Sequence, residues 1–261
     1  MNQNQPLLHK PTKGWEADLP LPTTPHREIL SPLGIPPNHI DNIYFELHTS
    51  KFKKRGIIIW FGVVALCITL MQAISTINSI IHGKKSLLIA IGLIIIFIGI
   101  VISIYAIRTD ISPPLDEPIR FNRKRKKIYF YRFQSGDPLS RQGWGITPVV
   151  FNWEDLRAEA WSRRAPTTGV PFFTWGVDIA VVAPGTNHVI DRFQLASSRV
   201  DGEHMWAMAR AFMNQGPEAL PKYPNPPRDW NNDIPAYNLA RRLAPKVQWP
   251  ADMDRESRTA P

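Results

Sequence analysis

Cysteine is nearly absent from this sequence, with Cys67 as the single example among 261 residues. One thiol excludes a disulfide framework and any zinc site built on cysteine ligands. None of the seven histidines is spaced for metal binding with another histidine or with Cys67. The chain has no glycine-rich loop followed by Lys-Ser/Thr, and Gly143-Trp144-Gly145 lacks the remaining glycine of a dinucleotide fingerprint. The sequence therefore predicts no cofactor and no metal.

Catalytic patterns are equally scarce. Glu154, Asp155 and Glu159 could supply paired carboxylates for acid–base chemistry, although such residues more often form the solvated face of a short element. Ser197-Ser198 lacks the setting of a nucleophile elbow and is typical of a turn. We therefore expect a protein that is not an enzyme.

Excess charge is missing from both ends of the chain, although the net charge is +9. Residues 1–50 carry three Lys/Arg and five Asp/Glu, and residues 129–261 carry fifteen and fourteen. The surplus lies in residues 51–128, with thirteen against three. Positive charge around an apolar block indicates membrane orientation, so we expect no nucleic-acid partner.

Charged residues and histidine are missing from Leu87 to Ile107, a run of 21 residues. A helix of that length spans about 30 Å, the thickness of the hydrocarbon core of a bilayer. Ile57 to Ile81 is a second candidate span that is more polar in its last half. The pattern predicts a transmembrane hairpin with spans over 57–81 and 87–107, and the lipid bilayer as a partner.

The two predicted spans carry complementary faces. Polar residues at three- and four-residue spacing share one face of the first helix: Gln72, Ser75, Thr76 and Ser79. Small residues on the second helix allow close approach: Gly92, Gly99 and Ser103. We expect these faces to pack together; the alternative, a polar pore lining, is weaker because neither span holds Asp, Glu, Lys, Arg or His.

The loop between the spans is only His82 to Ser86, so both chain ends lie on one side of the membrane. Eleven Lys/Arg flank the hairpin on that side, against two lysines in the loop. The positive-inside rule then predicts a multi-pass protein with both termini in the cytoplasm. The apolar stretch begins too late for a secretory signal peptide.

Four segments follow from this pattern. We expect an extended, proline-rich arm over 1–50, the hairpin over 51–110, a folded cytoplasmic domain over 115–220 and a proline-rich tail over 221–261. Within the arm, 40–47 is apolar enough for a strand or a helical turn. Trp230, Tyr237 and Trp249 lie along the tail, where they are candidates for binding a protein partner or for packing over the domain.

The 115–220 segment alternates apolar and polar residues in the manner of strands. Residues 119–122 and 128–133 predict a hairpin around a charged turn, and 172–182 with 188–195 predict another across Pro184-Gly185-Thr186-Asn187. Residues 149–153 predict a further strand, and 153–161 fit a strand or a short helix. One amphipathic helix follows, capped by Asp201, with Met205, Trp206, Ala209, Phe212 and Met213 facing the core. The expected fold class is α+β: a transmembrane hairpin, then an antiparallel β domain with one C-terminal helix, in the order of a pleckstrin-homology-like barrel.

Several pieces of the C-terminal half resemble one family. They are 118–123 (PIRFNR) with Ile128-Tyr129, Trp153-Glu154-Asp155, and the helix end 206–213 followed by Gly216-Pro217 and Leu220-Pro221. The resemblance is to an uncharacterised family of bacterial inner-membrane proteins found beside type VI secretion effectors, with a two-helix hairpin before a cytoplasmic domain. It implies the bacterial inner membrane and a protein toxin or secretion component as partner.

Five consecutive cations form the densest charge cluster, and we call them the basic turn: Arg123, Lys124, Arg125, Lys126 and Lys127. Shortly after a membrane span, such residues are expected near anionic headgroups, each contributing about 1 kcal/mol. The first hairpin loop of pleckstrin-homology-like domains commonly holds lipid phosphates. The alternative is that these residues only fix the topology.

Three functions remain open on the sequence. The first is a non-enzymatic immunity or accessory protein that binds a cognate effector of type VI secretion. The second is a membrane-tethered module for lipid binding or scaffolding. The third is a membrane-active effector whose hairpin inserts into a target membrane.

Overall fold

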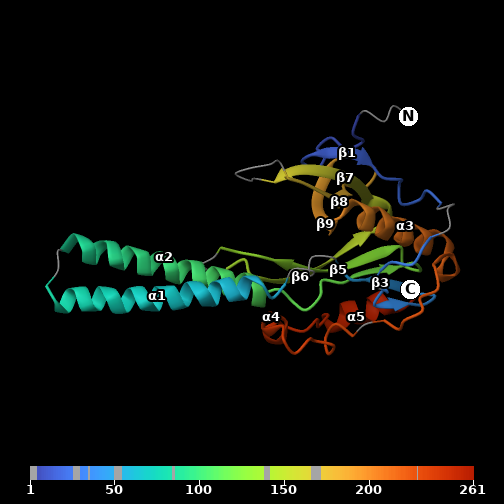
Figure 1. Cartoon of the computed structure of the whole chain (residues 1–261). Coiled ribbons are helices and arrows are strands. Elements are labelled where there is room, and N and C mark those ends of the chain that lie inside the picture. The colour runs from blue at the N-terminus through green and yellow to red at the C-terminus, as the bar shows by residue number, and fades with distance from the viewer. Residues whose placement is uncertain are drawn as a thin grey trace.

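The computed structural model describes residues 5–25, 30–34, 36–49, 55–83, 86–137, 142–165, 172–227 and 229–261. A helical hairpin projects from one end of a domain built on two β-sheets (Figure 1). The chain before the hairpin and the chain after it both lie in that domain.

The hairpin consists of α1 (Ile58–Ile81) and α2 (Ser86–Ile111), both long and apolar enough to cross a membrane. At 1.5 Å per residue they measure about 36 and 39 Å. α1 covers the predicted span over 57–81 apart from residue 57. α2 continues past the predicted end at 107 and so includes Arg108 and Asp110.

Small residues hold the two helices together, as the sequence predicts. A Cβ on Gly99 would lie 2.1 Å from Thr69 Oγ1, and a Cβ on Gly92 would lie 2.4 Å from Thr76 Oγ1. Both threonines are buried, and their hydroxyls donate to carbonyls within α1. Of the predicted polar face, Ser75 is exposed, so the contact runs along Thr69 and Thr76 at a seven-residue spacing.

Nine strands form two antiparallel sheets in the described residues. The four-stranded sheet has the order β1 (Trp15–Asp18), β7 (Leu156–Ala165), β8 (Phe172–Val182), β9 (Val189–Ala196). The five-stranded sheet has the order β2 (His39–Ile40), β3 (Tyr44–Leu47), β4 (Ile119–Asn122), β5 (Lys127–Gln134), β6 (Gly145–Asn152). The α+β class and the antiparallel pairing agree with the sequence prediction.

The N-terminal segment supplies three of these strands, where the sequence predicts an extended arm over 1–50. β1 pairs with β7, and β3 pairs with β4 so that Tyr44 faces Asn122 and Leu47 faces Ile119. Phe45 and Leu47 are fully buried. The prolines of this segment lie outside β1, β2 and β3 and so leave their ladder hydrogen bonds intact. The segment is therefore part of the domain and not an arm outside it.

The segment after β6 resolves an ambiguity of the sequence. Trp153 to Asp155 form a 3₁₀ turn, η2, and β7 begins at Leu156. Trp153 is buried and its ring lies 5.1 Å from that of Trp206. The chain therefore reverses direction at Trp153, and β7 returns toward the end of the domain from which the helices leave (Figure 1).

The amphipathic helix is α3 (Arg199–Gln215), and its predicted apolar stripe is buried in the core. Ser198, not Asp201, is the capping residue: its hydroxyl accepts from the Asp201 amide at 3.3 Å. Asp201 lies in the first turn instead. The Trp206 indole donates to Pro20 O at 2.8 Å, which fastens the N-terminal segment to α3.

The tail adds two short helices, α4 (Leu239–Leu243) and α5 (Ala251–Arg258), so α3 is not the single C-terminal helix that the sequence predicts. Another 3₁₀ turn, η3 (Pro217–Ala219), follows α3. The tail runs back along the five-stranded sheet, with α4 beside the base of the hairpin and α5 against β4 and β5 (Figure 1).

Candidate functional site

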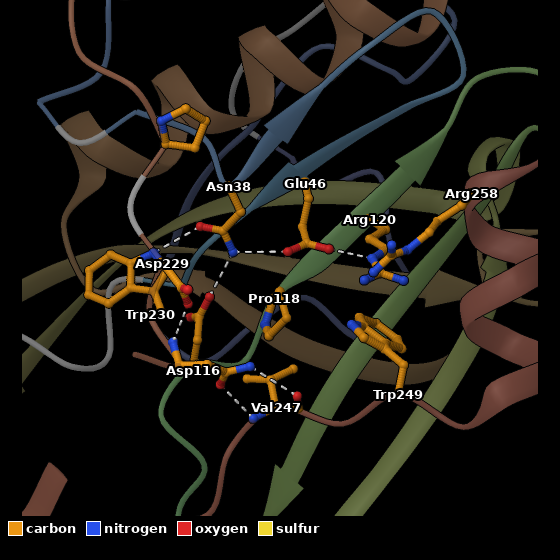
Figure 2. Close-up of a pocket in the computed structure, with 12 residues that line it drawn as sticks. Asn38, Glu46, Asp116, Pro118, Arg120, Asp229, Trp230, Val247, Trp249 and Arg258 are labelled. Carbon is orange, nitrogen blue, oxygen red and sulfur yellow. Dashed lines mark hydrogen bonds and ion pairs between the residues drawn. The ribbon is translucent and has the colours of Figure 1, made fainter. Parts of the chain in front are cut away.

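A pocket of about 360 Å³ lies between the five-stranded sheet and the tail. Figure 2 shows residues from three separate parts of the chain pointing into it. Asn38 lies just before β2 and Glu46 lies in β3. Asp116 lies before β4 and Arg120 within it, while Trp230 and Trp249 belong to the tail. We call this the tail pocket.

Arg120 is the centre of the charge network in this pocket, although its side chain is only 4% exposed. Its guanidinium bonds to the Glu46 carboxylate, and Nη1 donates to Asp254 Oδ1 at 2.6 Å and to Ser257 Oγ at 2.9 Å. The guanidinium carbon also lies 4.4 Å from the centre of the Trp249 ring. A buried arginine with two carboxylates and an aromatic face is well compensated, so Arg120 joins strand β4 to helix α5.

Asn38 joins the residues on the opposite wall of the tail pocket. Its amide nitrogen donates to Glu46 Oε1 at 3.0 Å and to Asp116 Oδ2 at 2.9 Å, while its carbonyl accepts from Trp230 Nε1 at 2.9 Å. All four side chains are thereby fixed relative to one another. This geometry depends on the tail, because removing Trp230 would leave the Asn38 carbonyl without that donor.

Asp116 is the most perturbed acid of the pocket. It is 2% exposed, and this burial raises the pKa of its carboxyl to about 7, against the hydrogen bonds from Asn38 and from the Glu117 amide. A carboxyl with this pKa exchanges a proton near neutral pH. The proton state of the pocket floor therefore changes in the physiological range.

The tail pocket is suited to a polar guest with an apolar side. Trp249 Nε1 is shielded from solvent and donates to no residue that the structure describes. The rim carries both signs of charge, with Asp229 and the half-exposed Arg258. The tail pocket thus presents a shielded indole N–H, tryptophan rings and side chains of both charges.

The basic turn lies elsewhere. It joins β4 to β5 at Lys127, the first residue of β5. At the other end of β5, Gln134 pairs with Gly145, which directly follows Trp144 in the chain. The Trp144 ring lies 4.9 Å from the Arg108 guanidinium at the end of α2. Lys127 and Gln134 are seven residue steps apart along β5, which is about 24 Å. The basic turn therefore lies at the end of the sheet remote from the hairpin.

Contacts within the domain occupy most of the basic turn. Arg125 donates to Thr259 O at 3.0 Å, Lys126 donates to Met213 O at 2.7 Å, and Lys127 pairs with Glu256 at 2.8 Å. The Arg123 guanidinium lies against Gly216. Lys124 is exposed. The predicted headgroup residues thus hold the C-terminal tail and the end of α3 in place.

The three predicted tail aromatics have different settings. Trp230 stacks on His48 at 5.3 Å, and Trp249 packs on Tyr131 at 5.2 Å, so both contact the domain. Tyr237 is 84% exposed. The structure brings two of the three together in the tail pocket and leaves Tyr237 outside it.

The acidic residues weighed for catalysis do not form a pair. Glu159 is fully buried, its carboxylate pairs with Arg192 at 2.9 Å and it accepts from the Thr12 amide at 3.0 Å. Glu154 and Asp155 lie in η2, before β7 begins. Glu159 therefore anchors the N-terminal segment.

Sequence reasoning missed Asn38, Glu46 and Asp116 as site residues, and counted Arg120 only as a topology signal. One hint was present: Asp116-Glu117 is an acidic pair within a flank that is otherwise strongly positive. No spacing rule joins Asn38 to Trp230, because 192 residues separate them.

Comparison with known proteins adds a family. The model of a family of unknown function, DUF6708, matches residues 95–261, from the middle of α2 through the tail. The match includes Asp116, Arg120, Trp230 and Trp249, while Asn38 and Glu46 lie outside it. Searches of curated proteins and of solved structures found no match. Since the match covers well over half of the sequence, the chain belongs to the DUF6708 family.

Proposed function

We propose that this chain is a non-enzymatic protein of the bacterial inner membrane that binds a protein partner at the cytoplasmic face. The observation that carries the proposal is the apolar outer surface of the hairpin. Trp60, Phe61, Met71 and Phe97 are each more than half exposed, although they belong to the most apolar part of the chain. So large an apolar surface is stable in lipid and not in water.

The sheets support the proposed topology independently of charge. β3 precedes the hairpin and β4 follows it, and the two strands pair directly. Both flanks must therefore be on one side of any membrane that the hairpin crosses. The positive flanks, with Arg55 and Arg108 at the hairpin base, favour the cytoplasm for that side.

Partner binding is the role that the tail pocket supports best. Its walls come from the N-terminal segment and the tail, and Trp249 Nε1 offers a shielded donor. From the family resemblance we infer that the partner is an effector of type VI secretion or another component of that system. The chain would then act as an immunity or accessory protein that holds the effector at the membrane.

Three tests address this function: reporter fusions, survival on co-expression and co-purification. Alkaline phosphatase fused after Pro261 should be inactive and should become active when inserted at Gly83; activity at Pro261 would overturn the topology. Cells that express a type VI effector encoded beside this protein should survive only when this protein is also present. Equal survival without it would sink the immunity role, and failure of the two proteins to co-purify would sink binding.

A charge reversal on the pocket rim links the binding to the tail pocket. Arg258→Glu should weaken co-purification, because Arg258 lines the pocket. Arg255→Glu is the matched control: Arg255 lies one turn earlier on α5, is 76% exposed and does not line the pocket. Equal losses in both variants would indicate a non-specific charge effect.

A membrane-tethered lipid-binding or scaffolding module is the second candidate, and a pleckstrin-homology-like fold for the two sheets stays a prediction. The position of the basic turn argues against lipid binding at that site, since the turn is remote from the hairpin and largely paired within the domain. We propose instead that the basic turn holds the tail. No observation favours the membrane-active effector.

A further inference from the structure

The strands β7 and β8 extend beyond their neighbours in the sheet. β9 pairs with β8 from Val177 onward, and β1 pairs with β7 up to Trp161. Residues 162–165 and 172–175 therefore extend as a two-stranded ribbon, which we call the β7–β8 ribbon. Its base is tied to the N-terminal segment, since the Ser162 amide donates to Gly14 O at 2.8 Å. A two-stranded ribbon has little stability by itself, so an outside contact with its exposed side chains would stabilise it.

Three aromatic residues of this ribbon are exposed: Phe172 at 60%, Phe173 at 44% and Trp175 at 47%. The Phe173 and Trp175 rings lie 6.2 Å apart on one face, and the exposed Arg164 is directly opposite Phe173 across the strand pair. Farther along β8, residues 176–182 are buried. The exposed aromatics are thus confined to the end of the strand, and the domain core does not use them.

The ribbon extends toward the membrane that we propose for the hairpin. β6 begins at Gly145, next to Trp144, whose ring lies beside Arg108 at the end of α2. The chain leads away from the hairpin along β6, reverses at Trp153 and returns toward the hairpin through β7. Ten residues of β7 cover about 33 Å, more than the eight residues of β6. Figure 1 shows the open ends of β7 and β8 on the side of the domain from which α1 and α2 leave.

We infer that the β7–β8 ribbon is a second membrane contact, in which Phe172, Phe173 and Trp175 enter the headgroup region of the bilayer. Phenylalanine and tryptophan rings favour that region, and Arg164 is placed to meet anionic headgroups. The ribbon and the hairpin together would hold the domain in one orientation against the bilayer. This inference depends on the proposed insertion of the hairpin.

The test uses the full chain in vesicles of phosphatidylcholine and phosphatidylglycerol, with one environment-sensitive dye per protein. Cys67, in α1, is the native labelling site and reports insertion of the hairpin. Phe173→Cys in a Cys67→Ser background reports the ribbon. Ile190→Cys in the same background is the control, because Ile190 is 60% exposed but lies at the opposite end of the four-stranded sheet.

The dye at 173 should emit at shorter wavelength than the dye at 190, and lipids carrying a quencher near the headgroup should quench it several-fold more strongly. The dye at 67 should be quenched most by lipids that carry the quencher near the ends of their acyl chains. A shielded dye at 67 with an aqueous dye at 173 would overturn the ribbon contact alone. An aqueous dye at 67 would overturn both the inserted hairpin and the ribbon contact.

Discussion

The carboxylate of Asp110, near the end of α2, accepts a hydrogen bond of 2.9 Å from the backbone amide of Ile59, at the start of α1. The same carboxylate accepts from the Gly56 amide at 3.1 Å. One helix of the hairpin thus caps the other, at the point where the hairpin meets the domain. The Arg55 guanidinium completes the junction by donating to Asp110 O at 2.9 Å and to the carbonyls of Pro113 and Pro114.

Asp110→Ala should destabilise this junction by about 0.5–2 kcal/mol, the usual cost of losing a helix cap. Asp110→Asn keeps one acceptor oxygen and should cost less. Thermal unfolding of the full chain in detergent measures both. An unchanged midpoint in Asp110→Ala would show that the amides at 56 and 59 are satisfied without it.

Gly99→Leu should disturb the hairpin, because a Cβ at this position already meets Thr69 Oγ1 at 2.1 Å. Overpacking of this kind costs about 1–3 kcal/mol. Ile98→Leu is the control, since Ile98 is 49% exposed on the outer surface. The unfolding midpoint in detergent should fall for the first variant and hold for the second; the reverse order would mean that a different face of α2 contacts α1.

Trp206→Ala should lower the free energy of unfolding by about 3–5 kcal/mol, as large aromatic truncations in cores do. Trp206 is 1% exposed, packs on Trp153 and bonds to Pro20 O. Trp175→Ala, at an exposed position, should leave the midpoint of chemical denaturation nearly unchanged. Similar midpoints for the two variants would place Trp206 outside the core.

Asp116 should make stability depend on pH. Its folded pKa of about 7 lies above its ordinary value of 3.8, so the folded protein binds this proton more tightly than the unfolded chain does. The stabilisation of the folded protein by this bound proton is fully present below pH 3.8 and is lost as the pH rises to about 7. Between these two values the free energy of unfolding falls by about 1.4 kcal/mol for each pH unit.

Asp116→Asn isolates this effect, because the amide oxygen can still accept from Asn38 while the position no longer titrates. The stability of the variant relative to the native protein should rise between pH 4 and pH 7, measured by urea denaturation at each pH. A constant difference across that range would contradict the raised pKa.

The hairpin should be removable from the domain. Arg55 and Pro114 are in contact, so the chain ends left after deleting residues 56–111 already lie side by side. A short Gly/Ser linker in their place should give a soluble, cooperatively folding protein. A fragment beginning at 115 should not fold in this way, because it lacks β1, β2 and β3. A stable 115–261 fragment in circular dichroism and denaturation would show that those strands are dispensable.

Elements with a strong local pattern could be predicted from the sequence. The alternation in 119–122 and 128–133 gives β4 and β5, the apolar runs give α1 and α2, and the apolar stripe around Trp206 gives α3. The close approach at Gly92 and Gly99 follows from small residues at helical spacing, whereas Thr69 lies outside the predicted polar face. In each case the residues that determine the element are close together in the chain.

The tail pocket could not be predicted in the same way. Asn38 meets Trp230 and Arg120 meets Asp254 only after the tail has packed against the five-stranded sheet, and neither pair shares a motif. Proline content suggested that 1–50 stays outside the domain, but Phe45 and Leu47 bury enough apolar surface to hold short strands in the sheet. The basic turn shows why position along the chain is not enough: it is close to the apolar hairpin in sequence and remote from it in space.

The pairing of Trp15 with Trp161 also sets the order in which the protein can be assembled. Translation at about 5–20 residues per second needs roughly 10 s to deliver β7 after β1 has left the ribosome. With the hairpin in the membrane as proposed, α1 and α2 enter the bilayer during that interval, while the N-terminal strands wait unpaired. Insertion therefore precedes closure of the domain, and it tethers the two halves of the domain within reach of each other before either can fold.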